Sequence, residues 1–236
     1  MKKILIATAT YNEAGNIKIL LKKIINLKIK LDILIVDDNS PDKTYLEVKK
    51  FMKKFQNIYL TNRKIKKGLD TAHKYMYKFA LKKNYDYLIT MDADLSHDPN
   101  IIPKFLKHIK KYDCVIGSRY MRGGRNNLSG FRLFLSKFGN LFIQFILKVN
   151  LSEFTTSYRC FNLKKLKKFN LKDVDAGGYS FFMNTVYLIK YMGYSIKEIP
   201  IIFYERTHGK SKIPTLELFR TLLNIFFIRF KFLQKN

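Results

Sequence analysis

The stretch YLITMDADLSHDP, residues 87–99, decides the fold class of this chain. A run of apolar and β-branched residues, typical of a buried strand, leads directly into Asp92, Asp94 and Asp98. Carboxylates so close together repel one another, and a bound cation offsets that repulsion. Asp92 and Asp94, one residue apart, therefore predict a site for Mg²⁺ or Mn²⁺, because hard divalent cations prefer oxygen ligands.

Short apolar runs alternate with amphipathic segments on both sides of this stretch. The expected strands cover residues 3–9, 31–37, 57–61, 85–91 and 112–118. The expected helices cover about residues 13–27, a segment that begins after residues 39–42, and residues 69–83 and 100–111. This alternation is typical of an α/β domain built on a mostly parallel sheet with helices on both faces.

The second half of the chain is less regular. Helices are expected near residues 131–149, 163–169 and 178–192, a strand at 195–205, and a final helix from Pro214. The sequence contains no internal repeat, no low-complexity linker and no long block of charge. We therefore expect a single domain over residues 1–213, followed by a C-terminal amphipathic helix over residues 214–236.

The composition constrains the partners of the protein. With 236 residues, 47% of them hydrophobic, the chain is long enough for one α/β domain with a sizeable core. The 45 Lys and Arg residues stand against 18 Asp and Glu residues, which gives a formal net charge of +27. This excess indicates an anionic partner, or else a lysine-rich composition spread over solvated helix faces, and both explanations stay open.

Three features of the sequence concern the cellular setting. Cys114 and Cys160 have no second Cys or paired His nearby, so we expect reduced core residues, which suits the cytoplasm. The N-terminal apolar run is too short for a signal peptide, because Asn12 and Glu13 follow at once. No apolar run approaches the ~20 residues that a spanning helix needs, so we expect a protein that is soluble or lies on a membrane.

Polar residues follow four of the expected strands, at the edge where open parallel sheets bind ligands. They are Tyr11, Asn12 and Glu13, then Asp37 and Asp38, then Asp92 and Asp94, and finally Ser118 and Arg119. For residues 37–42, capping of the next helix and ligand binding stay open, but all four groups together favour a site. The chain has no glycine-rich phosphate loop, so a divalent cation is the expected partner of a nucleotide diphosphate.

Several longer motifs occur in the order and spacing of one family. They are TYNEAGNI (10–17), ILIVDDNSPDKT (33–44), MDADLSHDPNIIPKFL (91–106), YDCVIGSRYMRGG (112–124), SYRCF (157–161), GGYSF (177–181) and EIPIIFYERTHGKSKI (198–213). In these motifs the chain resembles glycosyltransferase family 2, and within it the dolichol- or polyprenol-phosphate mannose synthases. The resemblance covers about residues 3–230.

The resemblance implies a single-domain GT-A fold, which is a Rossmann-like α/β class, and an enzyme that transfers a hexose. The implied donor is GDP-mannose, and the implied acceptor is a polyprenyl or dolichyl phosphate. The implied reaction inverts the anomeric centre and depends on Mg²⁺ or Mn²⁺. On this reading, residues 1–118 form the nucleotide-sugar half and residues 119–213 form the acceptor half.

The site residues of the family carry over onto matching positions. By resemblance, the nucleotide sugar is bound by Ala9, Tyr11, Glu13, Val36, Asp38, Asp92, Ala93 and Asp94. The implied metal ligands are Asp92, Asp94 and Ser96. The acceptor phosphate is bound by Arg119, Arg132, Ser136, Arg206 and Lys210, and the implied catalytic residues are Asp94, Arg119 and Arg206. Departures from the family pattern occur at Ala9, Asp70, Ser157 and Asn184, where Pro, Gly, Gly and Glu are usual.

The residue types of the second half also favour a phosphate acceptor. A sugar hydroxyl needs a general base, usually a carboxylate, and the second half offers few. These are Glu153, Asp173, Asp175, Glu198, Glu205 and Glu217. A phosphate has a second pKa of roughly 6 and is already ionised at neutral pH, so it needs cations to place it, a role that suits Arg.

The final helix indicates a surface that faces lipid. Between Pro214 and Leu233, a wide face of Leu and Phe opposes a narrow polar stripe. Such a helix lies in the headgroup region of a membrane or packs on the domain as core, and residues 131–149 have the same two readings. We therefore expect a cytoplasmic enzyme that is peripherally associated with an anionic membrane surface, with a membrane-anchoring protein as a further candidate partner.

Two alternatives stay open. One is a family 2 enzyme that uses another nucleotide sugar, such as UDP-glucose, or a glycan hydroxyl as acceptor. The other is a nucleic-acid-binding protein, suggested by the net charge alone. No recognisable binding module accompanies that charge, so we expect no nucleic-acid partner.

Overall fold

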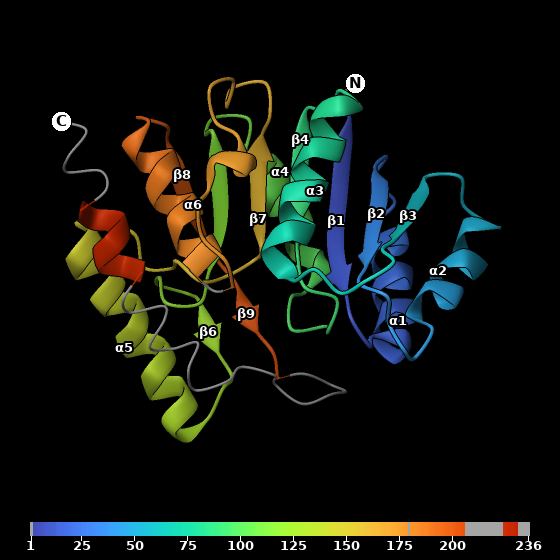
Figure 1. Ribbon diagram of the computed structural model, residues 1–236, viewed down its shortest axis with the longest axis horizontal. Helices are drawn as coiled ribbons and strands as arrows, with labels where there is room; N and C mark the ends of the chain where they lie inside the picture. Colours follow the sequence, from blue (N-terminus) through green and yellow to red (C-terminus); the bar gives the residue numbers. More distant parts are fainter. Residues whose placement is uncertain (1, 179, 206–223, 231–236) are drawn as a thin grey trace.

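The computed structural model describes residues 2–178, 180–205 and 224–230, apart from the side chains of Phe131 and Arg132 (Figure 1). At its centre lies a seven-stranded sheet in the order β3-β2-β1-β4-β7-β5-β8. The strands are β1 (Ile4–Thr10), β2 (Asp32–Asp37), β3 (Ile58–Asn62), β4 (Tyr87–Thr90), β5 (Cys114–Ser118), β7 (Arg159–Asn162) and β8 (Ile196–Pro200). Only β7 runs antiparallel to its neighbours, β4 and β5, so the prediction of a mostly parallel sheet is confirmed.

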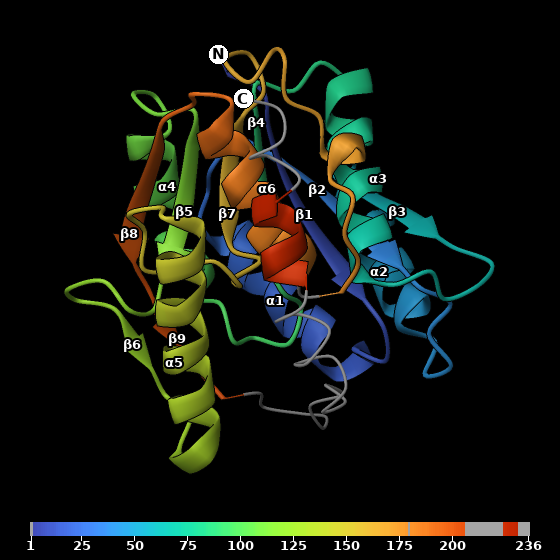
Figure 2. The same cartoon turned by 60° about the vertical axis from the view of Figure 1, so that its left-hand side comes forward.

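Helices cover both faces of this sheet, as predicted (Figures 1 and 2). One face is covered by α1 (Ala14–Asn26), α2 (Thr44–Met52) and α4 (Ile102–His108). The other face is covered by α3 (Leu69–Lys82), α5 (Gly130–Leu147), α6 (Ser180–Tyr191) and the helical segment 224–230. Two short 3-10 helices, η1 (Pro99–Ile101) and η2 (Leu171–Asp173), complete the helical elements that the structure describes.

Alternating side chains along the strands divide the core in two. In β1, Leu5 and Ala7 point into the core under α3, α5 and α6, whereas Ile6 points into the core under α1, α2 and α4. Cys114 is buried in the first core and Cys160 in the second, and both are free thiols, as expected. Because both faces of the sheet are buried, its strands have near-continuous apolar sequences.

One helix that was predicted in the second half does not form. Residues 163–169 form turns instead, and they follow β7, a strand that the sequence analysis did not predict. Leu163, Leu166 and Phe169 are buried at a spacing that imitates a helix. The chain turns there because the Asn162 side chain ends β7 by accepting the backbone N–H of Lys165 at 3.2 Å.

The strand predicted over residues 195–205 is divided between two sheets. Its first part is β8, and its second part, β9 (Ile202–Phe203), pairs in parallel with β6 (Arg125–Asn126). The division falls at Ile201, whose N–H donates to Ser118 O at 3.0 Å and whose carbonyl accepts the Arg125 N–H at 2.9 Å. The small sheet therefore lies beyond the carboxyl end of β5 (Figure 1).

The predicted C-terminal helix lies mostly outside the described residues, of which only 224–230 belong to it, and these are helical. Ile225 and Ile228 of this segment are buried in the same core as Ile143 and Leu147 of α5. The rings of Phe142 on α5 and Phe226 lie 6.2 Å apart. Within the part of the chain that the structure describes, no helix is both long and apolar enough to cross a lipid bilayer.

Candidate active site

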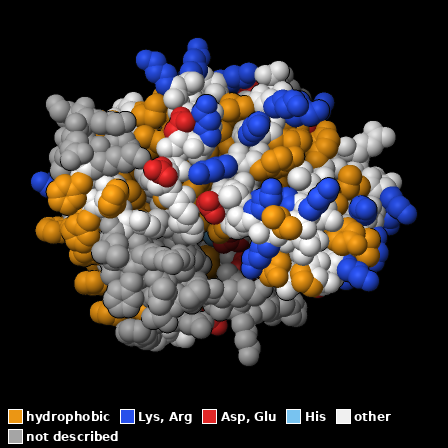
Figure 3. Space-filling view, in the orientation of Figure 1, with side chains coloured by type: hydrophobic (Ala, Val, Ile, Leu, Met, Phe, Trp, Pro, Cys, Tyr) orange, Lys and Arg blue, Asp and Glu red, His pale blue; other side chains and the backbone are white. Residues whose placement is uncertain are grey.

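The predicted polar residues gather at one edge of the main sheet. The carboxyl ends of β1, β2, β4 and β5 lie at this edge, and the antiparallel β7 begins there. The space-filling view shows a hollow near the middle of one face, with acidic side chains inside it and basic side chains on its border (Figure 3). This hollow is the candidate active site.

Asp37 has a structural role at this edge. It is completely buried and accepts hydrogen bonds from the Thr10 hydroxyl (2.7 Å) and from the Ser40 N–H and hydroxyl (2.9 and 2.6 Å). The Ser40 hydroxyl oxygen in turn accepts the backbone N–H of Asn12 at 3.0 Å. These contacts fasten the loop after β2 to the loop after β1.

Asp38 faces a different set of partners. It pairs with Arg63 and accepts the backbone N–H groups of Lys67 and Gly68 at 3.2 and 3.0 Å. The Lys66 ammonium lies 3.8 Å from the centre of the Tyr11 ring, a cation–π distance. The segment 63–68 therefore closes one wall of the site around the predicted residues Tyr11 and Asp38.

The other residues predicted for the nucleotide sugar are placed less directly. The side chains of Val36 and Ala93 are buried in the two cores, and Ala9 packs against the same core as Val36. Glu13 accepts a hydrogen bond from the Asn16 side chain at 2.7 Å. The structure thus uses Val36 and Ala93 for packing, and a contact of these residues with a nucleotide stays a prediction.

Asp92 follows β4 and is held from one side. Its Oδ1 accepts the Ser157 hydroxyl at 2.6 Å, and its backbone N–H donates to His97 Nδ1 at 3.1 Å. The side chain nevertheless keeps 32% of its surface exposed. An oriented, solvent-accessible carboxylate of this kind is suited to binding a cation.

Asp94 is more deeply placed than Asp92. Its Oδ1 accepts both the backbone N–H (3.1 Å) and the hydroxyl (2.6 Å) of Ser96, which is completely buried. The structure thus places Ser96 as a hydrogen-bond donor to Asp94, and its role as a metal ligand stays a prediction. The third carboxylate of the motif, Asp98, accepts the Asn100 N–H at 3.0 Å and caps η1.

His97 is a buried neutral imidazole. Its ring packs between Tyr158 and Phe203, with centroids 4.9 and 5.6 Å away. Burial holds the pKa of His97 below its usual value, although the nearby Asp92 carboxylate acts in the opposite direction. Because Nδ1 accepts the Asp92 N–H, the ring proton lies on Nε2, which is 3.4 Å from the Thr156 hydroxyl oxygen.

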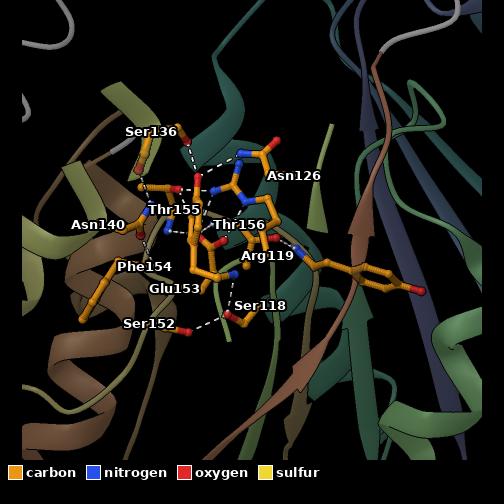
Figure 4. Close-up of polar contacts among 12 residues, drawn as sticks. Ser118, Arg119, Asn126, Ser136, Asn140, Ser152, Glu153, Phe154, Thr155 and Thr156 are labelled. Atoms are coloured by element: carbon orange, nitrogen blue, oxygen red, sulfur yellow. Dashed lines mark hydrogen bonds and ion pairs between the residues drawn. The ribbon is translucent and has the colours of Figure 1, made fainter. Parts of the chain in front are cut away.

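Arg119 forms a buried ion pair with Glu153 (Figure 4). Arg119 Nε donates to Oε2 at 2.6 Å, and Nη2 donates to Oε1 at 2.8 Å and to the Thr155 hydroxyl oxygen at 2.7 Å. Within the described residues, Nη1 makes no hydrogen bond. The predicted contact of Arg119 with the acceptor is therefore restricted to one end of the guanidinium group.

Arg119 and Glu153 each stabilise the charged form of the other. Burial alone would lower the pKa of Arg119 and raise that of Glu153, because each loses its water. Their mutual attraction and hydrogen bonds outweigh burial, so the Arg119 pKa is raised above and the Glu153 pKa lowered below its usual value. Both groups are charged at neutral pH.

Ser136, predicted to bind the acceptor phosphate, is brought close to Arg119 by way of Tyr120 (Figure 4). The Ser136 and Tyr120 hydroxyl oxygens are 2.5 Å apart, and the Asn126 amide donates to the Tyr120 oxygen at 2.9 Å. The Arg119 guanidinium carbon lies 5.1 Å from the centre of the Tyr120 ring. Helix α5 and β6 thereby meet the end of β5.

Residues 152–158, which we call the bridging loop, connect the two halves of the site. Ser157 donates to Asp92 on the side of the predicted metal site, and Glu153 pairs with Arg119 on the side of the predicted acceptor. The loop leads into β7, which lies between β4 and β5 in the sheet. The antiparallel strand therefore carries this loop to both carboxyl ends at once.

Arg159 holds the bridging loop through hydrogen bonds to two of its backbone carbonyl groups. It is buried, and its Nε and Nη2 donate to the carbonyl oxygens of Thr156 (2.9 Å) and Phe154 (2.8 Å). Burial lowers the pKa of Arg159 to about 10. The Phe154 N–H donates to the Asn140 side chain at 2.9 Å, so α5 is also tied to this loop.

Some predicted site residues lie outside the described part of the chain. Arg206 and Lys210 are among them, as is the side chain of Arg132. Among the described residues, no group of three or more His, Cys, Asp or Glu side chains is placed to hold a metal ion.

The sequence analysis gave several residues of this site no role in it. Glu153 was named only among the few carboxylates of the second half, Ser157 only as a departure from the family pattern, and His97 and Arg63 were not singled out. His97 lies within the quoted motif, and Glu153 is an acidic residue beside the apolar Phe154, which is an available signal of a buried charge. Nothing in the sequence links either residue to its partner.

The chain matches known proteins over most of its length. The profile of glycosyl transferase family 2 matches residues 5–169. An undecaprenyl-phosphate mannosyltransferase of Micrococcus luteus is 32% identical over 212 residues, covering 89% of this chain and 87% of that protein. A polyprenol monophosphomannose synthase of Mycolicibacterium smegmatis is 34% identical over 215 residues, covering 90% of this chain and 81% of that protein.

Solved structures with the same architecture are more distant in sequence. Glucosyl-3-phosphoglycerate synthase from Mycobacterium tuberculosis, in complex with Mn²⁺, UDP and phosphoglyceric acid, has a TM-score of 0.68 at 13% identity. The match covers 95% of this chain and 78% of that one. A mannosyltransferase from Pyrobaculum calidifontis, in complex with GDP-mannose and Mn²⁺, has a TM-score of 0.61 at 18% identity and covers 99% and 64%. These likenesses confirm the predicted GT-A fold.

Proposed function

Because this chain belongs to glycosyltransferase family 2, we propose that it transfers mannose from GDP-mannose to a polyprenyl phosphate. The transfer inverts the configuration at the anomeric carbon. The names of the two relatives that are about one-third identical to this chain support mannose as the sugar and a polyprenyl phosphate as the acceptor.

The ion pair between Glu153 and Arg119 is the observation that carries this proposal. A hydroxyl acceptor would need a carboxylate free to take its proton, at a heavy-atom distance of about 3 Å. Glu153 lies on the proposed acceptor side of the site. Both of its carboxylate oxygens accept hydrogen bonds from Arg119, and Oε1 also accepts the backbone N–H groups of Thr155 and Thr156. Its lowered pKa makes it a poor base. A phosphate acceptor needs no base, so this arrangement favours a lipid phosphate.

Asp92 and Asp94 fit a divalent cation. The partly exposed carboxylate of Asp92 and the hydrogen-bonded carboxylate of Asp94 supply oxygen ligands at the edge of the sheet. The two solved neighbours described above contain Mn²⁺ with a nucleotide or nucleotide sugar, which supports the same class of ion here. When bound, such a cation stabilises the negative charge of the departing diphosphate.

The acceptor phosphate would be placed by the basic side of the site. Arg119 would offer Nη1 from its fixed position against Glu153. Ser136 hydrogen-bonds Tyr120, whose ring lies 5.1 Å from the Arg119 guanidinium carbon. Arg132, Arg206 and Lys210 complete the proposed set by resemblance. Arginine suits this role because its planar fork matches phosphate oxygens and keeps its charge at all relevant pH values.

An exposed aromatic surface supports binding at a membrane face. On α5, one side packs in the core through Ile143 and Leu147, and the opposite side is solvent-exposed. The exposed apolar side chains are Phe134, Phe138, Leu141 and Phe145 on α5 and Phe226, Phe227 and Phe230 on the segment 224–230. They lie along the left edge of the molecule in Figure 3. A surface of this kind, on a chain of net charge +27, suits peripheral association with an anionic membrane in the cytoplasm.

The experiment that tests the proposal is a matrix of donors and acceptors. The purified chain is incubated with GDP-mannose or UDP-glucose, and with undecaprenyl phosphate or a glycan that offers hydroxyl groups only. Release of the free nucleotide and the anomeric configuration of the product are measured. We expect turnover with GDP-mannose and the lipid phosphate, inverted product, loss in excess EDTA, and recovery with Mg²⁺ or Mn²⁺. Turnover on the glycan alone would overturn the proposed acceptor.

Replacing Asp94 tests the metal assignment. We expect Asp94→Asn to lower turnover at least 1,000-fold, about 4 kcal/mol or more in the barrier, because a cation at a developing charge contributes several kcal/mol. Mn²⁺ binding in the presence of GDP should be lost while the circular dichroism spectrum stays unchanged. Wild-type turnover in the folded variant would exclude Asp94 from the site.

A further inference from the structure

Ser157 places its hydroxyl group on one oxygen of Asp92. The Oγ–Oδ1 distance of 2.6 Å is in the range of a charge-assisted hydrogen bond to an ionised carboxylate. Ser157 is 3% exposed, so its hydroxyl does not turn outward to water. The bond also spans 65 positions of the chain, which means that the fold, and not local spacing, brings the two groups together.

The backbone around Ser157 is fixed on both sides. Its carbonyl oxygen accepts the hydroxyl of Thr90, the last residue of β4, at 2.6 Å. The carbonyl of the next residue, Tyr158, accepts the N–H of Gly117 in β5 at 2.9 Å. Ser157 is therefore a donor held at a fixed position between two strands of the sheet.

The second oxygen of Asp92 is not held in this way. Oδ2 lies 3.7 Å from His97 Nδ1, which is beyond hydrogen-bond length. That nitrogen accepts the backbone N–H of Asp92, so it has no proton to offer the carboxylate. The protein thus engages Oδ1, whereas Oδ2 accepts no hydrogen bond from any described residue. The Asp92 side chain as a whole is 32% exposed.

We propose that Ser157 is a positioning residue for the metal site, which holds Asp92 so that this carboxylate binds a divalent cation through Oδ2 alone. The inference rests on the cation of the proposed function and goes beyond it by separating the roles of the two oxygens. A carboxylate fixed in advance loses little rotational freedom when the cation binds. Partners of this kind typically matter about 10–100-fold in metal affinity.

Two single substitutions test this role. Ser157→Ala removes the donor to Asp92. Thr90→Val is the matched control, because it removes a buried hydroxyl group that bonds the carbonyl of the same Ser157 but does not touch Asp92. Mn²⁺ binding is measured by electron paramagnetic resonance of the free ion, with and without GDP, and thermal unfolding is recorded for each protein.

We expect Ser157→Ala to weaken Mn²⁺ binding in the presence of GDP by about 10- to 100-fold. Thr90→Val should keep the wild-type Mn²⁺ affinity even if it melts at a lower temperature. The Michaelis constant for the polyprenyl phosphate should be unchanged in Ser157→Ala, since the contacts of Arg119 are intact.

Each other outcome has a separate meaning. Wild-type protein that binds no Mn²⁺ with GDP would overturn the proposed cation, and this inference with it. Equal Mn²⁺ affinity in wild type and Ser157→Ala would overturn the inference alone. Equal weakening in Ser157→Ala and Thr90→Val would assign the effect to a loosened loop. Complete loss in Ser157→Ala would make the hydroxyl a ligand and refute its positioning role.

Discussion

Residues 87–99 and the bridging loop 152–158 both hold site residues, but they fix them by different means. In the first region, the side chains of Asp94 and Asp98 are held locally: Ser96 donates to Asp94, two positions earlier, and Asp98 caps its own helix. Asp92 is the exception, because its partner Ser157 belongs to the bridging loop. In the bridging loop, Glu153 pairs with a residue 34 positions earlier. Local contacts follow from spacing along the chain, whereas contacts between distant segments exist only once the sheet has formed.

The difference is also one of energy. Each local contact in residues 87–99 is a single hydrogen bond, which contributes about 1 kcal/mol net. In the bridging loop, two opposite charges are buried together, and removal of one leaves the other buried without its opposite charge. The two regions should therefore respond very differently to single substitutions.

The largest expected effect is that of Glu153→Gln. We expect it to lower the free energy of unfolding by about 3–5 kcal/mol, because Arg119 keeps its charge in a buried site. Chemical denaturation measures the change. The matched control is Glu198→Gln, which should cost about 1 kcal/mol, because Glu198 accepts hydrogen bonds from Ser152 of the same loop and has no arginine partner among the described residues.

A double substitution separates the charge from the packing. Arg119→Met combined with Glu153→Gln removes both charges, so the loss should be smaller than the sum of the two single losses. If the two losses simply add, the buried pair does not stabilise the loop, and the contrast with residues 87–99 disappears.

The same pair predicts an acid dependence of smaller size. The folded-state pKa of Glu153 is lowered, so its contribution to stability is present above the unfolded pKa of about 4.3 and is lost as the pH falls through the folded value. Between about pH 5 and pH 3, wild type should lose more stability than Glu153→Gln. Unfolding free energies measured at several pH values check this. Parallel curves would mean that the pKa of Glu153 is the same in the folded and the unfolded protein.

A local contact should cost less. Asp98→Ala removes the cap of η1 and should lower the free energy of unfolding by about 1 kcal/mol, with Asp92 and Asp94 unaffected. The backbone carbonyl of Asp98, which accepts the Tyr158 hydroxyl, is retained in this variant. A loss as large as that of Glu153→Gln would show that residues 87–99 also depend on distant parts of the fold.

The smallest effect on stability is expected on the aromatic surface. Phe145 is 79% exposed, so Phe145→Ser should change the free energy of unfolding by no more than about 0.5 kcal/mol. It should nevertheless reduce binding to anionic vesicles in a sedimentation assay. Leu81→Ser, an exposed apolar position on α3, should leave vesicle binding unchanged. Equal reduction in both variants would argue against α5 as the membrane-binding surface.

The sequence predicts one half of the fold better than the other. Each strand up to β5 contains an apolar run that is followed by polar residues. The sequence therefore predicts these strands, the helices between them and the carboxylates at the strand ends. In contrast, β7 has four residues and begins with the buried Arg159, so neither length nor apolarity marks it as a strand. The false helix at residues 163–169 has the same origin, because buried residues in turns can imitate helical spacing.

The candidate site also contains residues that the sequence predicts and residues that it does not. Asp92 and Asp94 follow from a motif, and Arg119 follows from its position at the end of β5. The partners that orient them, Ser157 and Glu153, could not be predicted, because a hydrogen bond between residues 65 apart depends on strand order. The roles proposed for Arg206 and Lys210 rest on resemblance and remain predictions.

The position of β7 has a consequence for the order of assembly during synthesis. Strands β4 and β5 run in the same direction but do not pair with each other, because β7 lies between them and pairs with both. A nascent chain released as far as residue 118 therefore contains two strands with an open slot between them. The slot closes only after residues 159–162 leave the ribosome, and the same event brings the bridging loop to Asp92 and Arg119. The joining of β4 to β5 and the arrival of Ser157 and Glu153 at the candidate site are thus one late, long-range step, which slows folding and leaves strand edges exposed in the meantime. For the same reason, cutting the gene at residue 118 should give two fragments that regain structure only when they are mixed.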